Sequence, residues 1–404
     1  MRIAIWHNLP SGGGKRALYN HVKGLKERGH YLEAWTTDMA SKDYLPLSDI
    51  ITEHILPVKS NIYKAYGISN PIKRIQKQIN IMNEHYKLCV RDIESQSFDL
   101  IFANSCSFSY MPYISNFSKI PVVVYLGEPY RPLYEAFPDN VWQAPSYEIK
   151  IKNARRIIKD FKETYAKRIQ VREEINAAKK YTAILVNSLF SRETVIRSYG
   201  IDASVCYLGI DEKMFSPGNF RKEPYVVGLG TISYIKSVHK AINIIAKVPL
   251  EFRPILKWIS NGYDDVYFKE VIKLAEELNV KFEPLLSISD EEIKKVLACA
   301  AVMIYMPHLE PFGLATLEAN ACGTYVIATP EGGVRESIVE GNNGSLITGF
   351  EELKISELIT KFVSDLDYAK SKGKEACDFV RNKWNRQMMV DNLEKVFIEQ
   401  TQTN

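Results

Sequence analysis

The sequence predicts an α/β protein in which two Rossmann-like domains face each other across a cleft. Three observations lead to this prediction. Short apolar runs typical of parallel strands alternate with longer amphipathic stretches along most of the chain. At 404 residues, the chain is too long for one ordinary hydrophobic core. A turn-rich break at residues 208–218 separates two series of such runs.

The first series of strand-like runs continues to residue 208. Between the first two runs, residues 15–28 place Leu18, Val22 and Leu25 on one helical face, and Gly29 ends this predicted helix. We therefore assign residues 1–208 to an N-terminal Rossmann-like domain. Its predicted strands are residues 2–6, 31–35, 99–103, 121–125, 183–187 and 204–208.

The second series occupies residues 209–380, which we assign to a C-terminal Rossmann-like domain. A final amphipathic helix is predicted at about residues 378–399. Because such sheets bind ligands at the carboxyl ends of their strands, motifs that directly follow strands are the first candidates for function. The predicted strands of this half are residues 225–229, 255–259, 280–282, 301–305 and 324–328.

Composition favours a cytoplasmic globular protein, with 46% hydrophobic and 25% charged residues. No apolar stretch approaches the roughly 20 residues needed to cross a bilayer. The first residues resemble a strand that enters a polar loop and not a signal peptide. The six cysteines are scattered, with neither C-x-x-C nor metal-ligand spacing, which favours buried thiols in a reducing compartment.

Residues 150–180 concentrate positive charge in a chain whose formal net charge is only +4. They hold eleven Lys or Arg against four acidic residues. One interpretation is a solvated helical face. The other is a basic surface that docks peripherally on the anionic inner membrane face, where each cation contributes about 1 kcal/mol. Nucleic acid is not favoured as a partner, because aromatic interleaving is slight and no recognised module occurs.

The most informative segment is residues 310–319, in which the carboxylates of Glu310 and Glu318 lie eight positions apart. A Pro-Phe-Gly turn follows a predicted strand and opens a short helix that Gly323 closes. This arrangement directs backbone amides and the positive end of the helix dipole at an anion. A diphosphate there would lie between a carboxylate for sugar hydroxyls and a second one for the ribose. The alternative is two solvated carboxylates near a helix start.

This segment resembles the E-x7-E signature of the retaining, family 4-type glycosyltransferases with the GT-B fold. Residues 329–336, with Gly-Gly-x-x-Glu, and residues 341–344 are similar to that family's second block. The likeness covers nearly the whole chain and is strong from about residue 301 to 346. It implies an acceptor-binding N-terminal domain, a donor-binding C-terminal domain, and a final helix, about residues 381–404, that crosses back onto the first domain.

The resemblance implies a role for each residue of this block. Glu310 would position the transferred sugar and support positive charge at its anomeric carbon. Glu318 would bind the ribose. Glu336 has two interpretations, a donor contact or a carboxylate that caps a helix. The backbone amides that would hold the diphosphate are those of Phe312, Gly313 and Leu314.

The loop that begins the C-terminal domain supplies the predicted leaving-group cation. In the resembled family, a Gly-Arg pair with a Lys six residues after that Gly supplies two cations to the diphosphate. Lys236 stands six residues after Gly230, but Thr231 replaces the Arg. Lys236 is therefore predicted to neutralise the leaving group, and we predict neither a metal nor a cofactor. Other candidates for the missing charge are Lys15, Arg131 and Lys240.

Two loops of the N-terminal domain complete the prediction. The glycines of one loop permit close backbone approach, although neither the Walker nor the dinucleotide spacing is present. The resemblance implies that this loop lines the cleft near the sugar and the acceptor; the alternative is a flexible connector. In the other loop, the family usually carries a His at about Gly127, which this chain lacks, leaving Glu128 and Arg131 as candidates. The first loop comprises Gly12, Gly13, Gly14 and Lys15.

Together these features predict a retaining glycosyltransferase that moves a hexosyl group from a nucleoside-diphosphate sugar to a hydroxyl of a glycan or lipid-linked acceptor. The expected pathway builds a surface polysaccharide or glycolipid. One alternative is a degenerate, non-transferring protein that binds a nucleotide sugar, suggested by the missing His and Arg. Another is an epimerase or hydrolase on the same fold. An NAD oxidoreductase is disfavoured, because the glycine fingerprint after residue 228 is incomplete.

Overall fold

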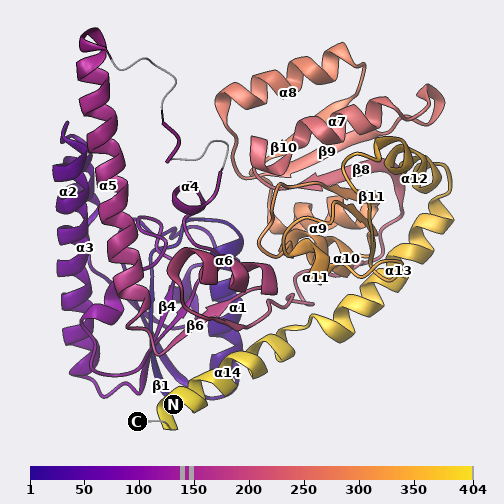
Figure 1. Ribbon diagram of the computed structural model, residues 1–404. Helices are drawn as coiled ribbons and strands as arrows, with labels where there is room; N and C mark the ends of the chain where they lie inside the picture. Colours follow the sequence, from indigo (N-terminus) through magenta and orange to yellow (C-terminus); the bar gives the residue numbers. More distant parts are fainter. Residues whose placement is uncertain (137–141, 145–149, 403–404) are drawn as a thin grey trace. The chain divides into compact units, whose positions relative to one another are not determined.

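The computed structural model describes residues 1–136, 142–144 and 150–402 (Figure 1). The chain forms two compact units. Unit 1 comprises Met1–Asn187, Ser191–Tyr207 and the chain from Val390 onward, and unit 2 comprises Ser188–Phe190 and Leu208–Met389. Each unit carries a parallel sheet with covering helices, so the prediction of an α/β protein with two Rossmann-like domains is confirmed.

The described part of unit 1 has a seven-stranded sheet in the order β3-β2-β1-β4-β5-β6-β7, with every neighbouring pair parallel. The order reverses between β1 and β4, which is where Rossmann-like sheets bind ligands at their carboxyl edge. The strands are β1 (Arg2–His7), β2 (Tyr31–Thr36), β3 (Thr52–Ile55), β4 (Leu100–Asn104), β5 (Val122–Tyr125), β6 (Ala183–Val186) and β7 (Ser204–Val205).

Helices cover both faces of this sheet because each one buries an apolar stripe. In α1 the predicted stripe of Leu18, Val22 and Leu25 is fully buried. In α3 the side chain of Asn70 accepts hydrogen bonds from the first amides, and Pro71 occupies the first helical position. The helices are α1 (Gly13–Glu27), α2 (Lys59–Tyr66), α3 (Pro71–Glu94), α4 (Arg131–Tyr134), α5 (Ala154–Ala178) and α6 (Leu189–Tyr199), whose first two residues belong to unit 2.

The C-terminal part of the chain returns to unit 1. The single helix predicted at residues 378–399, and the crossing helix at about 381–404, are in fact α13 (Leu366–Lys383) followed by α14 (Arg386–Gln402). The break occurs because Asn385 caps α14, its side chain accepting from the amide of Met388 at 2.9 Å. In unit 1, Phe397 of α14 meets Phe102 of β4 edge-on at 5.0 Å between ring centroids. Near the end of α14, Oγ1 of Thr401 donates to Sδ of Met1 at 3.8 Å.

Unit 2 has a six-stranded sheet in the order β10-β9-β8-β11-β12-β13, again with parallel neighbours. The strands are β8 (Glu223–Leu229), β9 (Ile255–Ser260), β10 (Phe282–Leu286), β11 (Ala300–Tyr305), β12 (Val326–Ala328) and β13 (Gly344–Leu346). Its remaining helices are α7 (Val238–Ala246), α8 (Asp265–Glu277), α9 (Asp290–Cys299), α10 (Leu314–Ala321), α11 (Val334–Ser337) and α12 (Glu352–Ser364). Because this order reverses between β8 and β11, the loops that follow these two strands form the site below.

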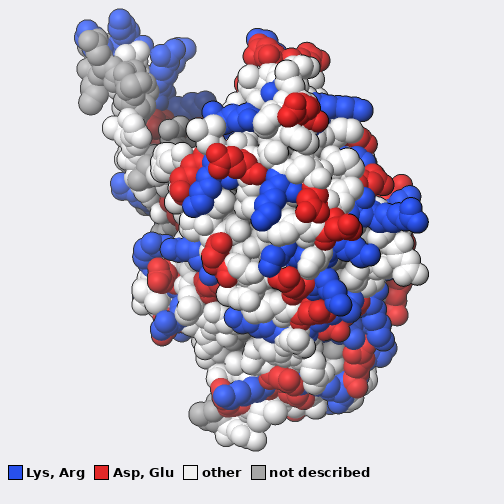
Figure 2. All heavy atoms as spheres, turned by 90° about the vertical axis from the view of Figure 1, so that its right-hand side faces the viewer, with Lys and Arg blue, Asp and Glu red and all other residues white. Residues whose placement is uncertain are grey.

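The surface in Figure 2 mixes charges of both signs, with Lys and Arg beside Asp and Glu over the face that is drawn. All six cysteines are buried free thiols. Of the helices in the described ranges, none combines the length and the apolar character that a bilayer span requires.

Candidate functional site

The loops after β8 and β11 bring together the two residues predicted to be catalytic. Nζ of Lys236 lies 2.6 Å from Oε2 of Glu310. Lys236 belongs to a short 3-10 turn after β8, and Glu310 belongs to the loop after β11. Their side chains are 23% and 14% exposed, so the ion pair is shielded from bulk water but open to a ligand.

Tyr305, the last residue of β11, also contacts this carboxylate. Its phenol is buried and hydrogen-bonds to Glu310. Burial, together with the neighbouring Glu310 carboxylate, raises the pKa of Tyr305 well above its usual range. The phenol therefore stays protonated and donates to Glu310. A lysine and a tyrosine thus hold the carboxylate of Glu310 in place before any ligand binds.

Gly230 makes room for Lys236. Its φ of 145° lies in the region that favours glycine, and a Cβ there would lie 3.2–3.3 Å from three side-chain carbons of Lys236. Its carbonyl accepts from Nε1 of Trp258 at 2.7 Å, which fixes the loop against β9. Thr231, which stands where the resembled family has an Arg, is exposed. The backbone here therefore positions one cation.

Gly313 forms the turn into α10. It has a φ of 90°, and its carbonyl accepts from both the amide and the hydroxyl of Thr316, at 3.0 and 2.7 Å. The first amides of a helix have no acceptor within that helix, so the start of α10 is suited to hold an anion. The Phe312 side chain is buried and meets Trp384 edge-on at 5.5 Å. Any contact of Phe312 with a ligand is therefore a backbone contact.

The Gly-Gly pair of the second block packs against the backbone of the first. The amide of Gly333 donates to the carbonyl of Glu310 at 2.7 Å. A Cβ on Gly332 would lie 2.2 Å from the carbonyl oxygen of Glu310, and one on Gly333 would lie 2.1 Å from that of Pro311. Both distances are too short for real atoms, so this approach requires glycine. The second block therefore shapes the loop that carries Glu310.

Glu331 and His308 support the same loop, and the sequence did not indicate this role. One carboxylate oxygen of Glu331 lies 2.9 Å from Nδ1 of His308 and accepts from the amide of Leu309 at 3.3 Å. Leu309 has a φ of 47°, which is strained for a leucine. The amide of His308 donates to the carbonyl of Ile235 at 2.8 Å, which ties this loop to the turn that carries Lys236. The sequence feature that could have indicated this supporting role is the position of His308 shortly after a predicted strand.

Glu318 lies inside the unit and not on its surface, with 4% of the residue exposed. Its helix is anchored by a pair of buried amides that the sequence analysis missed. Nδ2 of Asn320 donates to the carbonyl of Asn343 at 2.8 Å, and Nδ2 of Asn343 donates to Oδ1 of Asn320 at 2.9 Å. Together with the shielded Glu310, this burial does not fit the alternative of two solvated carboxylates.

Glu336 accepts hydrogen bonds from two backbone amides. Its carboxylate oxygens lie 2.8 Å from the nitrogen of Leu189 and 3.0 Å from that of Phe190. This capping was one of the two interpretations of the residue. The donor contact stays a prediction.

The glycine loop of unit 1 follows β1 as predicted. Gly12 has a φ of 136°, and α1 begins at Gly13. Lys15 is 1% exposed, and its Nζ has no hydrogen-bond partner within the described ranges. Burial lowers the pKa of Lys15 below its ordinary value. An unpaired buried ammonium group at a helix start is suited to bind an anion.

The second loop of unit 1 forms a small charged cluster. The amide of Gly127 donates to Oγ of Ser105 at 3.3 Å. Arg131 lies 2.7 Å from Glu135 and 3.7 Å from Glu128. The structure thus brings Glu128 and Arg131 together within this unit. Across the described ranges, no cluster of three His, Cys, Asp or Glu has the arrangement of a metal site.

Solved structures of other proteins share the fold of this chain. HepE from Anabaena, solved with UDP and glucose, has a TM-score of 0.72 at 17% identity and covers 98% of this chain and 99% of its own. Sucrose-phosphate synthase from Thermosynechococcus elongatus has a TM-score of 0.71 at 15% identity, with full coverage of both chains. The predicted GT-B fold is therefore confirmed.

The family follows from the sequence of unit 2. Residues 209–378 match the family described as Glycosyl transferases group 1. This match confirms the resemblance drawn from the two motif blocks.

Curated relatives match over part of their length. N-acetyl-alpha-D-glucosaminyl L-malate synthase from Bacillus anthracis is 22% identical over 49% of this chain and 54% of its own. D-inositol 3-phosphate glycosyltransferase from Stackebrandtia nassauensis is 26% identical over 54% and 53%. Probable sucrose-phosphate synthase from Thermosipho melanesiensis is 30% identical over 52% and 53%. The matched region thus spans about half the length of these relatives.

Proposed function

We propose that this chain is a retaining, metal-independent glycosyltransferase. It moves a hexosyl group from a nucleoside-diphosphate sugar to a hydroxyl acceptor. The observation that carries the proposal is the 2.6 Å pairing of Lys236 with Glu310, next to the first turn of α10. It joins a cation, an anion and a helix start, which are the groups that a diphosphate and a glycosyl cation require. The family match of residues 209–378 supports the same activity.

In the proposed mechanism, the amides of Phe312, Gly313 and Leu314 and the ammonium of Lys236 hold the diphosphate. Glu310 orients the sugar and stabilises positive charge as the bond between C1 and the phosphate oxygen breaks. The electron pair of that bond leaves with the nucleoside diphosphate. The acceptor oxygen bonds to C1 from the same face, and its proton passes to the departing phosphate oxygen. No protein base is required, and Glu318 contributes donor binding through the ribose.

We assign the donor to residues 209–380 and the acceptor to residues 1–208. In this assignment Gly230, Thr231 and Glu336 border the donor, and the loops at Gly12–Lys15 and Gly127–Arg131 serve the acceptor. Open Rossmann-like sheets bind ligands where the strand order reverses. In each unit, the loops assigned here follow strands that lie on either side of this reversal. A UDP-sugar is the first donor to test, since HepE has been solved in complex with UDP-glucose. The acceptor is a glycan or a lipid-linked saccharide of a surface polysaccharide or glycolipid.

Residues 150–180 would bring such a lipid-linked acceptor within reach at the inner membrane face. The short turn before α5 exposes Lys152. The first half of α5 exposes Arg155, Arg156 and Lys159 beside the apolar Ile158 and Phe161. A basic surface with apolar side chains favours anionic lipid. The test is co-sedimentation with vesicles containing phosphatidylglycerol, in which Arg155→Glu with Arg156→Glu weakens binding and neutral vesicles bind neither protein.

The primary test is a thermal-shift panel of UDP-, GDP- and ADP-sugars. A ligand that binds only the native state raises the melting temperature. The sugar nucleotides that carry one of the three bases should therefore give the largest rise. Incubation of the selected donor with candidate acceptors should then release nucleoside diphosphate and form a glycoside. A melting-temperature shift with neither release nor product would favour the alternative of a non-transferring nucleotide-sugar-binding protein. Isomerised donor without acceptor consumption would indicate an epimerase, and free sugar a hydrolase.

A further inference from the structure

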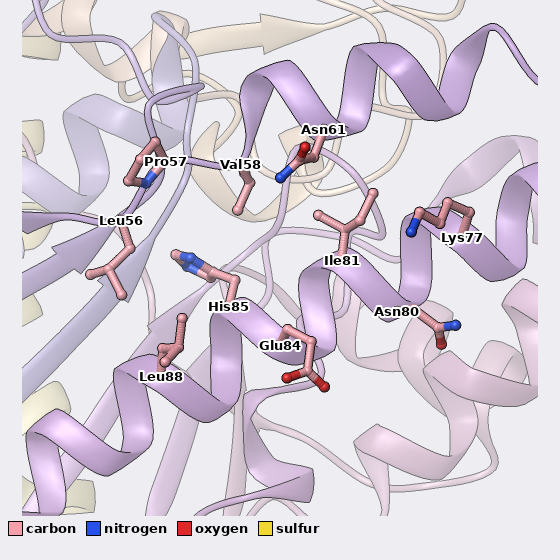
Figure 3. Close-up of a pocket in the computed structure, with 10 residues that line it drawn as sticks. All are labelled: Leu56, Pro57, Val58, Asn61, Lys77, Asn80, Ile81, Glu84, His85 and Leu88. Atoms are coloured by element: carbon pink, nitrogen blue, oxygen red, sulfur yellow. The ribbon is translucent and has the colours of Figure 1, made fainter.

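A groove on the surface of unit 1 lies apart from the loops assigned to glycosyl transfer. Its walls are the segment after β3, the helix α2 and one side of α3 (Figure 3). The cavity volume is about 400 Å³, which lies within the range of small-molecule sites. β3 is the outer strand of the sheet, whereas the proposed acceptor loops follow β1 and β5. The lining residues are Leu56, Pro57, Val58, Asn61, Lys77, Asn80, Ile81, Glu84, His85 and Leu88.

The buried residue His85 gives this groove a polar group without a partner. Its ring extends from α3 toward Leu56 and Pro57 (Figure 3), and the residue is 2% exposed. Nε2 of His85 accepts from the indole Nε1 of Trp6 at 3.1 Å. A neutral imidazole that accepts at Nε2 must carry its proton on Nδ1. Nδ1 of His85 has no hydrogen-bond partner in the described ranges, so a donor N–H is unsatisfied beside the groove.

His85 remains neutral, so the hydrogen bond that Nε2 accepts from Trp6 fixes its tautomer. Burial lowers the pKa of His85 to about 4, against a smaller opposing effect of Asp38. The imidazole is therefore uncharged at neutral pH. A buried N–H without an acceptor is destabilising, and a hydrogen bond to an oxygen atom of a ligand would remove that cost.

The other lining residues indicate the chemistry of that ligand. The exposed amides of Asn61 and Asn80 each offer a donor and an acceptor. The single cation, Lys77, is balanced by the single anion, Glu84, so the lining has no net formal charge. The apolar part of the wall comprises Leu56, Pro57, Val58, Ile81 and Leu88. A phosphate would need an excess of cations, and an acyl chain would leave the amides unsatisfied.

We propose that this groove is a second binding site for an uncharged, polyhydroxylated ligand, that is, a sugar ring. Hydroxyl groups both donate and accept, which matches the two amides, and the C–H face of a pyranose suits the aliphatic wall. A hydroxyl oxygen accepts from the Nδ1–H of His85. The site stands independently of the proposed transfer reaction, because it shares no residue with the loops at Lys236 and Glu310.

Ligand-observed saturation-transfer NMR with methyl α-D-glucopyranoside and methyl α-D-galactopyranoside tests the site. At ~10 mM sugar, a site with a Kd near 1 mM would be well occupied. We expect saturation transfer from the full chain and a shift of the His85 Nδ1–H resonance in the ¹⁵N-labelled protein. The exposed-site variants Asn61→Ala and Asn80→Ala should each weaken binding about tenfold, which corresponds to about 1.4 kcal/mol. The matched control, Gln76→Ala, changes an exposed residue of α3 outside the groove and should bind as the wild type does.

The same experiment includes outcomes that overturn the proposal. Binding of decanoate or inorganic phosphate in place of the sugars would assign the groove to another ligand class. Absence of sugar binding, or binding that survives both Asn substitutions, would refute it. Sugar that binds at the proposed transfer site is distinguished with the Glu310→Gln variant. This variant loses the saturation transfer that comes from the transfer site and keeps the saturation transfer that comes from the groove.

Discussion

Lys236 and Glu310 form an ion pair of 2.6 Å between the loops that follow β8 and β11. Opposite charges stabilise each other in this partly shielded position, so the pair holds both side chains in place before a donor arrives. In the proposed reaction, Lys236 exchanges the carboxylate for a diphosphate as the donor binds. Glu310 then faces the sugar, with Tyr305 still hydrogen-bonded to it.

Removing either charge of this pair should reduce catalysis. We expect Glu310→Gln and Lys236→Met each to lower kcat/KM by about 100- to 1,000-fold, the usual effect of losing one electrostatic contact to a transition state. Lys273→Met, which removes an exposed lysine of α8, serves as the control. Steady-state kinetics with the donor identified by thermal shift measures kcat/KM of each variant. Full turnover in Glu310→Gln would rule out the role assigned to Glu310.

Glu318 should matter for affinity more than for turnover. Its proposed contact with the ribose exists equally in the ground state and the transition state. Glu318→Gln is therefore expected to raise KM by about tenfold with little change in kcat, the pattern of lost uniform binding. Initial rates over a range of donor concentrations separate the two constants. A large fall in kcat at saturating donor would contradict the ribose assignment.

The Gly332-Gly333 pair predicts a steric effect that a matched control can isolate. A methyl group in Gly333→Ala would meet the Pro311 carbonyl oxygen at 2.1 Å, so the loop that carries Glu310 must shift. The φ of Gly333 is −75°, so backbone strain does not contribute. We expect Gly333→Ala to lower activity at least tenfold and to destabilise the protein by about 1–3 kcal/mol. Gly262→Ala meets nothing within 4 Å and should behave as the wild type in melting temperature and activity.

The contact between α14 and unit 1 predicts a stability effect. Phe397 is fully buried against Phe102, so Phe397→Ala should cost about 3–5 kcal/mol. Its sequence neighbour Ile398 is 40% exposed, and Ile398→Ala should cost under 1 kcal/mol. Hydrogen exchange of the amides in β1 and β4 measures the effect in unit 1. Equal protection in the two variants would show that α14 does not stabilise this sheet.

A buried carboxyl group in α5 predicts a dependence of stability on pH. Burial raises the pKa of Glu174 from 4.5 to about 7, although Gln170, Tyr134 and Tyr199 hydrogen-bond to it. Between these pH values the folded chain holds a proton that the unfolded chain has lost. The stabilising contribution is therefore complete below about pH 4.5 and is lost as the pH rises toward 7. Its full size is on the order of 3 kcal/mol.

Glu174→Gln keeps a neutral hydrogen-bonding group and removes this titration. The variant should be more stable than the wild type at pH 8 and should show a flatter stability profile between pH 5 and 7. Thermal unfolding monitored across that pH range provides the comparison. A wild type whose stability rises with pH over this range would contradict the raised pKa.

The strands with long apolar runs were predicted from the sequence, whereas β3 and β13 were missed. β1 and β11 are buried at nearly every position, and their runs alone identified them. β3 (Thr52–Ile55) is a four-residue outer strand whose positions are all at least partly exposed. It exists because it pairs with β2 and because His54 stacks on Trp35 at 4.6 Å between ring centroids. Such tertiary contacts leave no periodic pattern in the sequence.

The residues of the functional site were likewise predicted only in part from the sequence. The motif blocks indicated that Lys236 and Glu310 act together, although 74 positions separate them. The contact between His308 and Glu331 was missed because it depends on the backbone conformation at Leu309, which the sequence does not reveal. Likewise, the amide pair of Asn320 and Asn343 requires two loops to meet. Contacts between distant loops follow from strand order, which local patterns do not encode.

The position of residues 390–402 also constrains how the chain is made. These residues belong to unit 1 but leave the ribosome after all of unit 2. Phe102 therefore waits for its partner Phe397 while nearly three hundred intervening residues are translated, on the order of 15–60 s at usual elongation rates. Unit 2 can complete its core during that interval. We expect that a nascent chain stalled before residue 390 lacks the contact between Phe397 and Phe102, so that the first unit cannot complete its core.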